Sequence, residues 1–339
     1  MYSIVYVLTD NKKLNFYYEM RISIYSLRKR NFSGNIFVLL DLDTRDTLKR
    51  LTHNELEEFN VQLVVVDVPE KYTKTMRSRY IKTSMRKWVK GDFLFLDTDT
   101  IVAEELPEVI SEYDISLVLD SNVPCKDFTT ETRLYNRNLL NRCGCDDLLK
   151  DDLLYFNSGV IWVKDTELVH KLFEGWHRIW FDYLEKRGVS KDQAALNQIN
   201  KEMGGIIQRL SDLYNVQVTA DPFPAKYLAE AKIIHYFHIH GKDTYMLASE
   251  QIDKSDLTNP LIQQIIDAPK TAFNLCILMR KSSVRENILL SKQYEVLYAL
   301  YVKYPRIFNL GEKSTLFLLG LWTKVHGICR RLKKMFRMQ

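Results

Sequence analysis

Short apolar runs alternate with stretches of helical periodicity over the first hundred residues. The runs are rich in β-branched and aromatic residues and cover positions 4–8, 36–40, 61–68 and 93–96. Segments with an apolar residue at every third or fourth position separate them, at 14–30, 48–59 and 80–89. Because strands that alternate with helices form parallel sheets, the pattern predicts a doubly wound, mostly parallel α/β sheet.

The fourth run carries the most informative feature, since Asp97, Thr98 and Asp99 follow it directly. Four apolar residues in succession suit a central parallel strand that is covered on both faces. Mg²⁺ and Mn²⁺ prefer oxygen ligands, and Mg²⁺ is usually held by one or two carboxylates together with substrate phosphates. Ligands of open α/β sheets bind outside the carboxyl ends of the strands. The pair therefore predicts a metal–diphosphate site, with an ordinary Asp-rich turn as the alternative.

The middle of the chain adds further elements to this pattern. A strand is expected at 115–119, a polar turn opening into a strand at 155–163, and an amphipathic helix at 167–187. Another helix is expected to begin near Lys191, and a late strand at 232–237. The polar stretch between 121 and 149 gives no readable periodicity.

Charge and cysteine content narrow the class of protein. The 339-residue chain is 46% hydrophobic, enough for a real core, and carries a net charge of +5. Its basic excess is concentrated in the last sixteen residues, at Lys324, Arg330, Arg331, Lys333, Lys334 and Arg337. A nucleic-acid-binding domain would carry that charge across a folded face, so no nucleic-acid partner is expected. Five irregularly spaced cysteines fit free thiols in a reducing compartment.

Several motifs in order resemble glycosyltransferase family 8, a group of GT-A-fold enzymes that includes bacterial lipopolysaccharide glycosyltransferases and glycogenin. They are Asp97-Thr98-Asp99, residues 156–160, residues 192–197, and residues 234–236 followed by Gly241-Lys242, with residues 78–80 as an additional match. The resemblance spans about residues 2–245. It implies a Rossmann-like, mostly parallel central sheet flanked by helices, and the metal-dependent transfer of a hexose from a UDP-sugar with retention of configuration.

The resemblance also implies a role for individual residues. Asp97, Asp99 and His235 would bind Mn²⁺ or Mg²⁺, and Lys242 would contact a phosphate. Because the glycine and lysine come later here than in the family pattern, His240 remains an alternative metal ligand.

The remaining implied residues would bind the donor and the acceptor. Thr9 and Asp10 would contact uracil and ribose, and Arg79 the donor, with Arg77 close enough in sequence to compete for that assignment. Helix capping is the alternative for Asp10. Sugar contacts would come from Asp120, Asn157, Ser158 and Asp192. Gln193, paired with Asp192 as the catalytic residues, would present its amide oxygen near the anomeric carbon; the alternatives are a tight turn and a helix N-terminus.

The predicted organisation is a GT-A domain at 1–245 and a helical C-terminal region at 246–339. Within the first, residues 1–110 would bind nucleotide-sugar and metal, and residues 111–245 would form the acceptor side. An apolar run at 316–322 before the basic tail suits an anionic membrane surface, and a terminal helix packed on the core is the alternative. We therefore expect a cytoplasmic enzyme, peripheral to the inner face of the membrane, with a saccharide or glycolipid acceptor such as lipopolysaccharide.

Two other functions compete with this hypothesis. A sugar-phosphate nucleotidyltransferase would need a glycine-rich basic loop after the first strand, but Thr9-Asp10-Asn11-Lys12-Lys13 occupies that position and no glycine precedes Gly34. A non-catalytic, membrane-associated carbohydrate-binding protein could keep the same fold, because fold does not fix function. The intact Asp97, Asp99 and Gln193 favour an enzyme.

Overall fold

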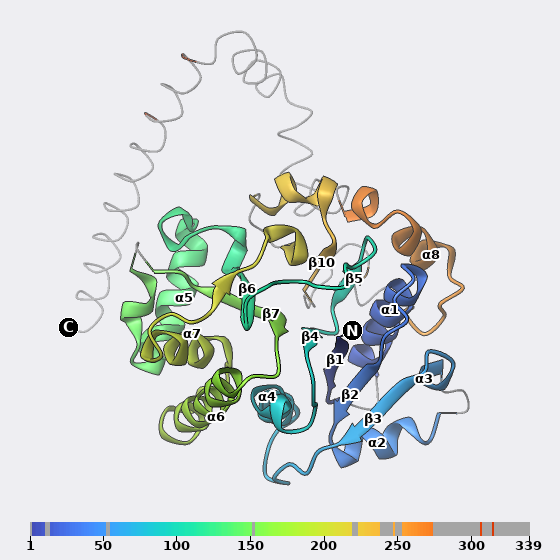
Figure 1. Cartoon of the computed structure of the whole chain (residues 1–339), viewed down its shortest axis with the longest axis horizontal. Coiled ribbons are helices and arrows are strands. Elements are labelled where there is room, and N and C mark those ends of the chain that lie inside the picture. Colours follow the sequence, from blue (N-terminus) through green and yellow to red (C-terminus); the bar gives the residue numbers. More distant parts are fainter. Residues whose placement is uncertain are drawn as a thin grey trace, which may run out of the picture. The chain divides into compact units, whose positions relative to one another are not determined.

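The computed structural model describes residues 2–10, 14–51, 55–150, 153–218, 223–237, 247, 253–273, 306 and 314 (Figure 1). The chain divides into two compact units, Met1–Arg280 and Lys281–Gln339. The boundary predicted after residue 245 does not coincide with this division. His240, Lys242, the apolar run at 316–322 and the basic tail lie outside the described residues.

A seven-stranded sheet forms the centre of the first unit. Its order is β3-β2-β1-β4-β7-β6-β8. The bounds are β1 Ser3–Leu8, β2 Ile36–Leu40, β3 Val61–Val65, β4 Phe93–Leu96, β6 Ile115–Leu119, β7 Phe156–Val163 and β8 Gln208–Arg209. Strands β1 to β4 are parallel and β7 is antiparallel to both β4 and β6. The predicted mostly parallel α/β sheet is confirmed.

The reversed direction of β7 decides where the polar groups meet. Because β7 runs against β4, it begins at the edge where β4 ends, with Val160 opposite Leu96. The residues at the start of β7 therefore lie beside Asp97.

A second, three-stranded sheet extends this edge. The chain turns after Asp99 into β5 (Thr100–Val102), which pairs with β10 (Ile233–His235), and β10 pairs with β9 (Val216–Gln217). The predicted late strand is confirmed in type and shortened to three residues. Its pairing with β5 places His235 opposite Thr100.

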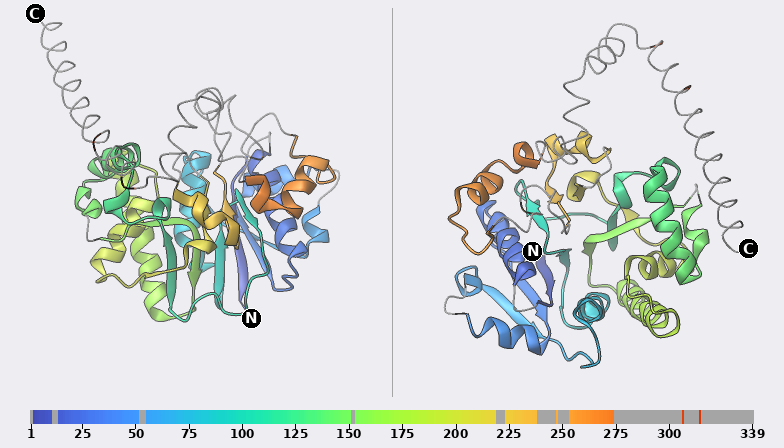
Figure 2. Two further views of the ribbon diagram at one scale, coloured as in Figure 1. Left: turned by 90° about the horizontal axis from the view of Figure 1, so that it is seen from above. Right: turned by 180° about the vertical axis from the view of Figure 1, so that it is seen from behind.

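Helices cover both faces of the central sheet (Figure 2). They are α1 Asn15–Lys29, α2 Leu42–Leu48, α3 Glu55–Glu58, α4 Lys74–Ser84, α5 Thr130–Cys143, α6 Glu167–Arg187, α7 Gln193–Glu202 and α8 Pro260–Asp267. Val5, Phe93 and Phe95 pack in one core cluster with α4, α6 and α7, while Ile4 and Tyr6 pack in another with α1. Burial on both faces explains the continuous apolar runs of these strands.

Two helices differ from the periodicity-based prediction. α4 begins at Lys74 rather than near residue 80, because Thr73 caps it by accepting a hydrogen bond from the Met76 N–H. α5 lies in the stretch that gave no readable pattern; Thr129 caps its start and Gly144, in the left-handed region at φ 67°, ends it. In both cases capping residues mark the helix where apolar periodicity is weak.

The described helices include none that is long and apolar enough to cross a membrane.

Candidate functional site

A pocket of about 750 Å³ opens at the carboxyl ends of β1 and β4. This volume is in the range of small-molecule sites, about 300–1,000 Å³. Most of the predicted site residues line it, from seven separate parts of the chain: Thr9, Arg79, Asp97, Asp99, Asp120, Asn157, Ser158, Asp192, Gln193 and His235.

Asp97, Asp99 and His235 converge in this pocket. One possible ligand atom from each lies within 4.8 Å of the others, and His235 Nε2 is 3.2 Å from Asp99 Oδ1. The backbone holds the pair in register, because the Tyr236 N–H donates to the Asp99 carbonyl at 3.0 Å. The His235 ring, 2% exposed, stacks on Phe237 with centroids 3.9 Å apart. Pairing of β5 with β10 thus joins segments far apart in sequence.

A chain of hydrogen-bonded amides determines which atom of Asn215 faces His235. Asn157 Nδ2 donates to the Asp120 carboxylate at 3.1 Å, so Asn157 Oδ1 is the acceptor for the Gly159 N–H and for Asn215 Nδ2, at 2.9 and 3.0 Å. Asn215 therefore turns its oxygen, Oδ1, toward His235 Nδ1, 3.2 Å away. An imidazole that donates from Nδ1 to this oxygen keeps its lone pair on Nε2.

This tautomer makes the three side chains suitable for a hard divalent cation. His235 Nε2 and Asp99 Oδ1 are then two acceptors that face one another, an arrangement that a cation placed between them would stabilise. Carboxylate oxygens with one imidazole suit Mn²⁺ or Mg²⁺, and orientation of a ligand histidine through its other nitrogen is usual in metal sites.

Gly159 makes the close approach of His235 possible. A Cβ on this residue would lie 2.3 Å from His235 Cε1, closer than any non-bonded contact allows. Its carbonyl accepts from the Asp97 N–H at 2.8 Å. Glycine, which has no side chain, therefore fits between His235 and Asp97, two of the three metal-ligand candidates.

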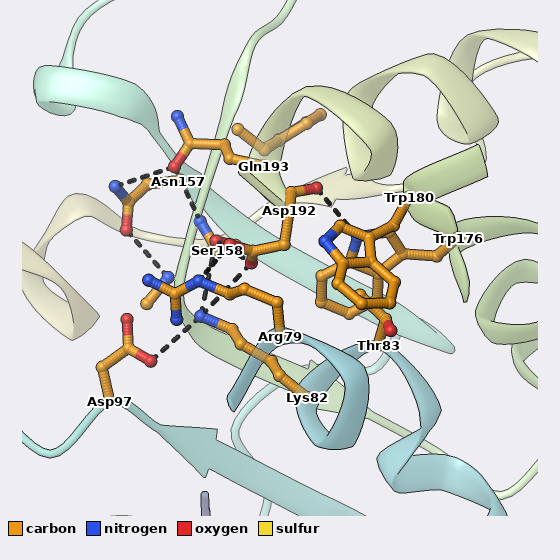
Figure 3. A network of polar contacts seen from close by, with 12 residues as sticks. Arg79, Lys82, Thr83, Asp97, Asn157, Ser158, Trp176, Trp180, Asp192 and Gln193 are labelled. Atoms are coloured by element: carbon orange, nitrogen blue, oxygen red, sulfur yellow. Dashed lines mark hydrogen bonds and ion pairs between the residues drawn. The ribbon is translucent and has the colours of Figure 1, made fainter. Parts of the chain in front are cut away.

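Lys82 is a site residue that the sequence analysis missed. Its ammonium lies 2.9 Å from Asp97 Oδ1 and 3.6 Å from Asp192 Oδ2 (Figure 3), and the residue is 1% exposed. Nζ is also 4.8 Å from the centre of the Phe95 ring. Lys82 follows Arg79 by three positions and so shares its helical face; the misplaced start of α4 hid this signal.

Arg79 and Lys82 together keep Asp192 ionised. Arg79 Nε lies 2.9 Å from Asp192 Oδ1. Burial raises the pKa of the Asp192 carboxyl, but the charges of Arg79 and Lys82 outweigh it and lower the pKa to about 2. Arg77 instead pairs with Asp41 and Asp43, so of the two arginines it is Arg79 that faces the pocket.

The amide of Gln193 lies against the start of β7. Its Oε1 accepts from Asn157 Nδ2 and from the Ser158 N–H, both at 3.3 Å, and Ser158 Oγ donates to Asp192 Oδ2 at 3.0 Å (Figure 3). For Gln193 Oε1 to contact a sugar as predicted, its two 3.3 Å hydrogen bonds must be replaced by a bond to the sugar.

Asp10 acts as a helix cap for α1. Its Oδ2 accepts from the Tyr17 N–H at 2.6 Å in the first turn of α1, and the pocket lining includes Thr9 but not Asp10. The contact of Asp10 with a nucleoside stays a prediction.

No protein-family model matches the chain, and no curated sequence matches it. Solved structures do resemble it. Mouse xyloside xylosyltransferase 1 matches with a TM-score of 0.44 at 16% identity over 69% of this chain and 97% of that one. The galactosyltransferase LgtC, in complex with donor and acceptor sugar analogues, matches with a TM-score of 0.41 at 15% identity over 69% and 86%.

The glycosyltransferase GlyE of Streptococcus pneumoniae matches with a TM-score of 0.46 at 15% identity. That match covers 79% of this chain and 64% of GlyE. All three similar structures are glycosyltransferases. Since identity and TM-score are low in each case, a function has to be argued from the pocket itself.

Proposed function

We propose that the protein is a metal-dependent glycosyltransferase that moves a hexose from a UDP-sugar to a saccharide or glycolipid acceptor. The observation that carries this proposal is the convergence of Asp97, Asp99 and His235 on one pocket. Transfer from UDP needs the diphosphate to leave, and charge growing on its oxygens is the largest catalytic demand. Mn²⁺ or Mg²⁺ held by these three residues would act as a Lewis acid on the diphosphate oxygens.

The remaining residues of the pocket suit the sugar part of such a donor. Asp120, Asn157 and Gln193 lie in one hydrogen-bonded row, and Ser158 connects Gln193 to Asp192. Sugar hydroxyls both donate and accept, so a row of this composition can bind several of them. Arg79 and Lys82 fix Asp192 in the ionised form, which accepts hydrogen bonds from sugar hydroxyls.

We propose transfer with retention, by attack on the face from which the diphosphate departs. The acceptor oxygen bonds to the anomeric carbon, the bond to the diphosphate breaks with its electron pair, and the hydroxyl proton passes to the leaving diphosphate. A covalent route would need a carboxylate nucleophile on the opposite face, and Gln193 is an amide. The motif resemblance described for the sequence supports the stereochemistry.

The acceptor and the cellular place of the enzyme are further parts of the proposal. The basic tail beginning at Lys324 follows an apolar run, a composition that suits an anionic leaflet. A peripheral enzyme at the inner face of the cell membrane would meet a membrane-borne glycolipid such as lipopolysaccharide.

Calorimetric titration with UDP tests the donor site. We expect binding in the presence of Mn²⁺ and none with a chelator. Asp99→Asn should abolish the metal-dependent binding, because it removes a negative ligand, and leave the circular dichroism spectrum unchanged, because the amide keeps the shape of this partly buried carboxylate. Asp43→Asn, an aspartate paired with Arg77 outside the pocket, is the control. Metal-independent binding, or full binding by Asp99→Asn, would contradict the proposal; a panel of UDP-hexoses then identifies the donor.

A further inference from the structure

One face of α5 forms a wall of the pocket. Thr132, Tyr135, Asn136 and Leu139 all line it, and their spacing of three, four and seven positions places them on one stripe of the helix. Leu140, one turn after Asn136 at the edge of this stripe, is fully buried in the main core cluster. The helix is therefore fixed by packing and presents a defined stripe to the pocket.

Asn136 ties this stripe to the polar row of the site. The residue is 3% exposed, and its Nδ2 donates to Asp120 Oδ2 at 3.1 Å. The other oxygen of Asp120 accepts from Asn157 Nδ2, also at 3.1 Å. The pocket thus contains three chemical zones in sequence: the Asp–Asp–His cluster, the carboxylate and amide row, and the stripe of α5.

Tyr135 is the prominent side chain of the third zone. It is 59% exposed although it lines the pocket, and Leu139 lies one turn further along. Asn136 and Asp120 place hydrogen-bonding groups directly beside them. An aromatic ring with an apolar body and polar neighbours matches a pyranose, which has a C–H face and a rim of hydroxyls.

We propose that this stripe is the subsite for a hexopyranose ring of the acceptor saccharide, stacked on Tyr135 with its hydroxyls toward Asn136 and Asp120. The proposal rests on the proposed transferase function, because the order of the three zones matches diphosphate, donor hexose and acceptor hexose. The reducing-end remainder of the acceptor would extend past Tyr135 toward solvent.

Saturation-transfer NMR with the α and β methyl glycosides of glucose and galactose tests the subsite without any donor. We expect the wild-type full chain to bind at least one of them. Tyr135→Ala should weaken that binding about tenfold, equal to about 1.4 kcal/mol, because the apolar face of the sugar loses its contact with the ring. Tyr135→Phe should retain it, since the ring face is kept. Tyr113→Ala removes a tyrosine of the same exposure, 58%, outside the pocket and should have no effect.

Calorimetry with UDP and Mn²⁺ on the same variants separates the two proposals. Unchanged UDP binding in Tyr135→Ala, with glycoside binding lost, supports the subsite. Tyr135-dependent glycoside binding in a protein that binds no UDP supports the subsite and overturns the proposed function. Equal glycoside binding by wild type and Tyr135→Ala, or no binding of any of the four glycosides by wild type, overturns the subsite.

Discussion

His235 offers a lone pair from Nε2 only while Nδ1 keeps the proton, and Asn215 is the residue that holds it there. The amide cannot turn over without facing its own nitrogen toward His235 and its oxygen toward Asn157 Oδ1. Asp120, two residues further along the chain of hydrogen bonds, fixes the direction of all the amides because a carboxylate only accepts. The Asp120 carboxylate therefore determines which atom of Asn215 faces the His235 ring at the other end of this chain of hydrogen bonds.

Replacement of Asn215 should weaken metal binding, although Asn215 is not one of the proposed ligands. In Asn215→Leu nothing accepts from Nδ1, and we expect Mn²⁺ affinity to fall about 10- to 100-fold, the usual effect of losing such a partner. Electron paramagnetic resonance of free Mn²⁺ measures it. Long-range ¹H–¹⁵N spectra of the Mg²⁺-bound protein should show His235 protonated at Nδ1 in wild type, and this signal should require a higher Mg²⁺ concentration in the variant.

A buried asparagine elsewhere controls for simple loss of stability. Asn200 accepts from the Ile207 N–H away from the pocket, and Asn200→Ala should leave Mn²⁺ affinity unchanged. If Asn215→Leu binds Mn²⁺ as tightly as wild type, Asn215 has no part in orienting the ligand.

At the scale of elements, packing of α4 against α6 places Arg79 and Lys82 beneath the pocket. His177 of α6 lies in this contact, with Nδ1 2.7 Å from Thr83 Oγ1 and its ring edge-on to Tyr80. Burial, together with the charge of Lys87, lowers the pKa of His177 from 6.5 to about 4. The folded protein thus keeps this imidazole neutral where the unfolded chain would protonate it.

The sign of the resulting pH dependence follows from linkage. Between pH 6.5 and about 4 the unfolded state binds a proton that the folded state does not, so stability falls as the pH is lowered through this interval. The urea midpoint should decrease from pH 7 to pH 4.5, and decrease less in His177→Gln. An equal decrease in both proteins would exclude His177 as the titrating group.

At the scale of the whole molecule, the proposed attachment to a membrane can be tested separately from chemistry in the pocket. Removal of residues 324–339 takes away six basic residues and no acid. We expect the shortened protein to lose binding to vesicles of anionic lipid, since each basic residue contributes about 1 kcal/mol near such a surface. Hydrolysis of the donor sugar-nucleotide should persist. Sedimentation with the vesicles measures the first and release of UDP the second; undiminished sedimentation would show that the tail is not the anchor.

Much of the pocket could be predicted from short segments of sequence, but Lys82 and Asn215 could not. Asp97, Asp99 and the residues at the start of β7 each follow or open an apolar run, so their place at a strand end is encoded locally. Apolar periodicity places the start of α4 near residue 80, which leaves Arg79 outside the helix and hides the face that it shares with Lys82. The Thr73 cap marks the true start of the helix. Asn215 could not be found, since nothing in its neighbours distinguishes it from a turn residue.

The alternation of buried strands and helices, the parallel sheet and the carboxylates at its edge follow from the sequence, because apolar runs and acidic strand ends are local properties. The distant groups that complete the site come together through long-range pairing and packing. Antiparallel pairing brings His235 to Asp99, the reversed β7 brings Asn157 and Gly159 beside Asp97, and α5 brings Tyr135 into the pocket. Each depends on long-range strand pairing and packing, and residue spacing carries no record of either.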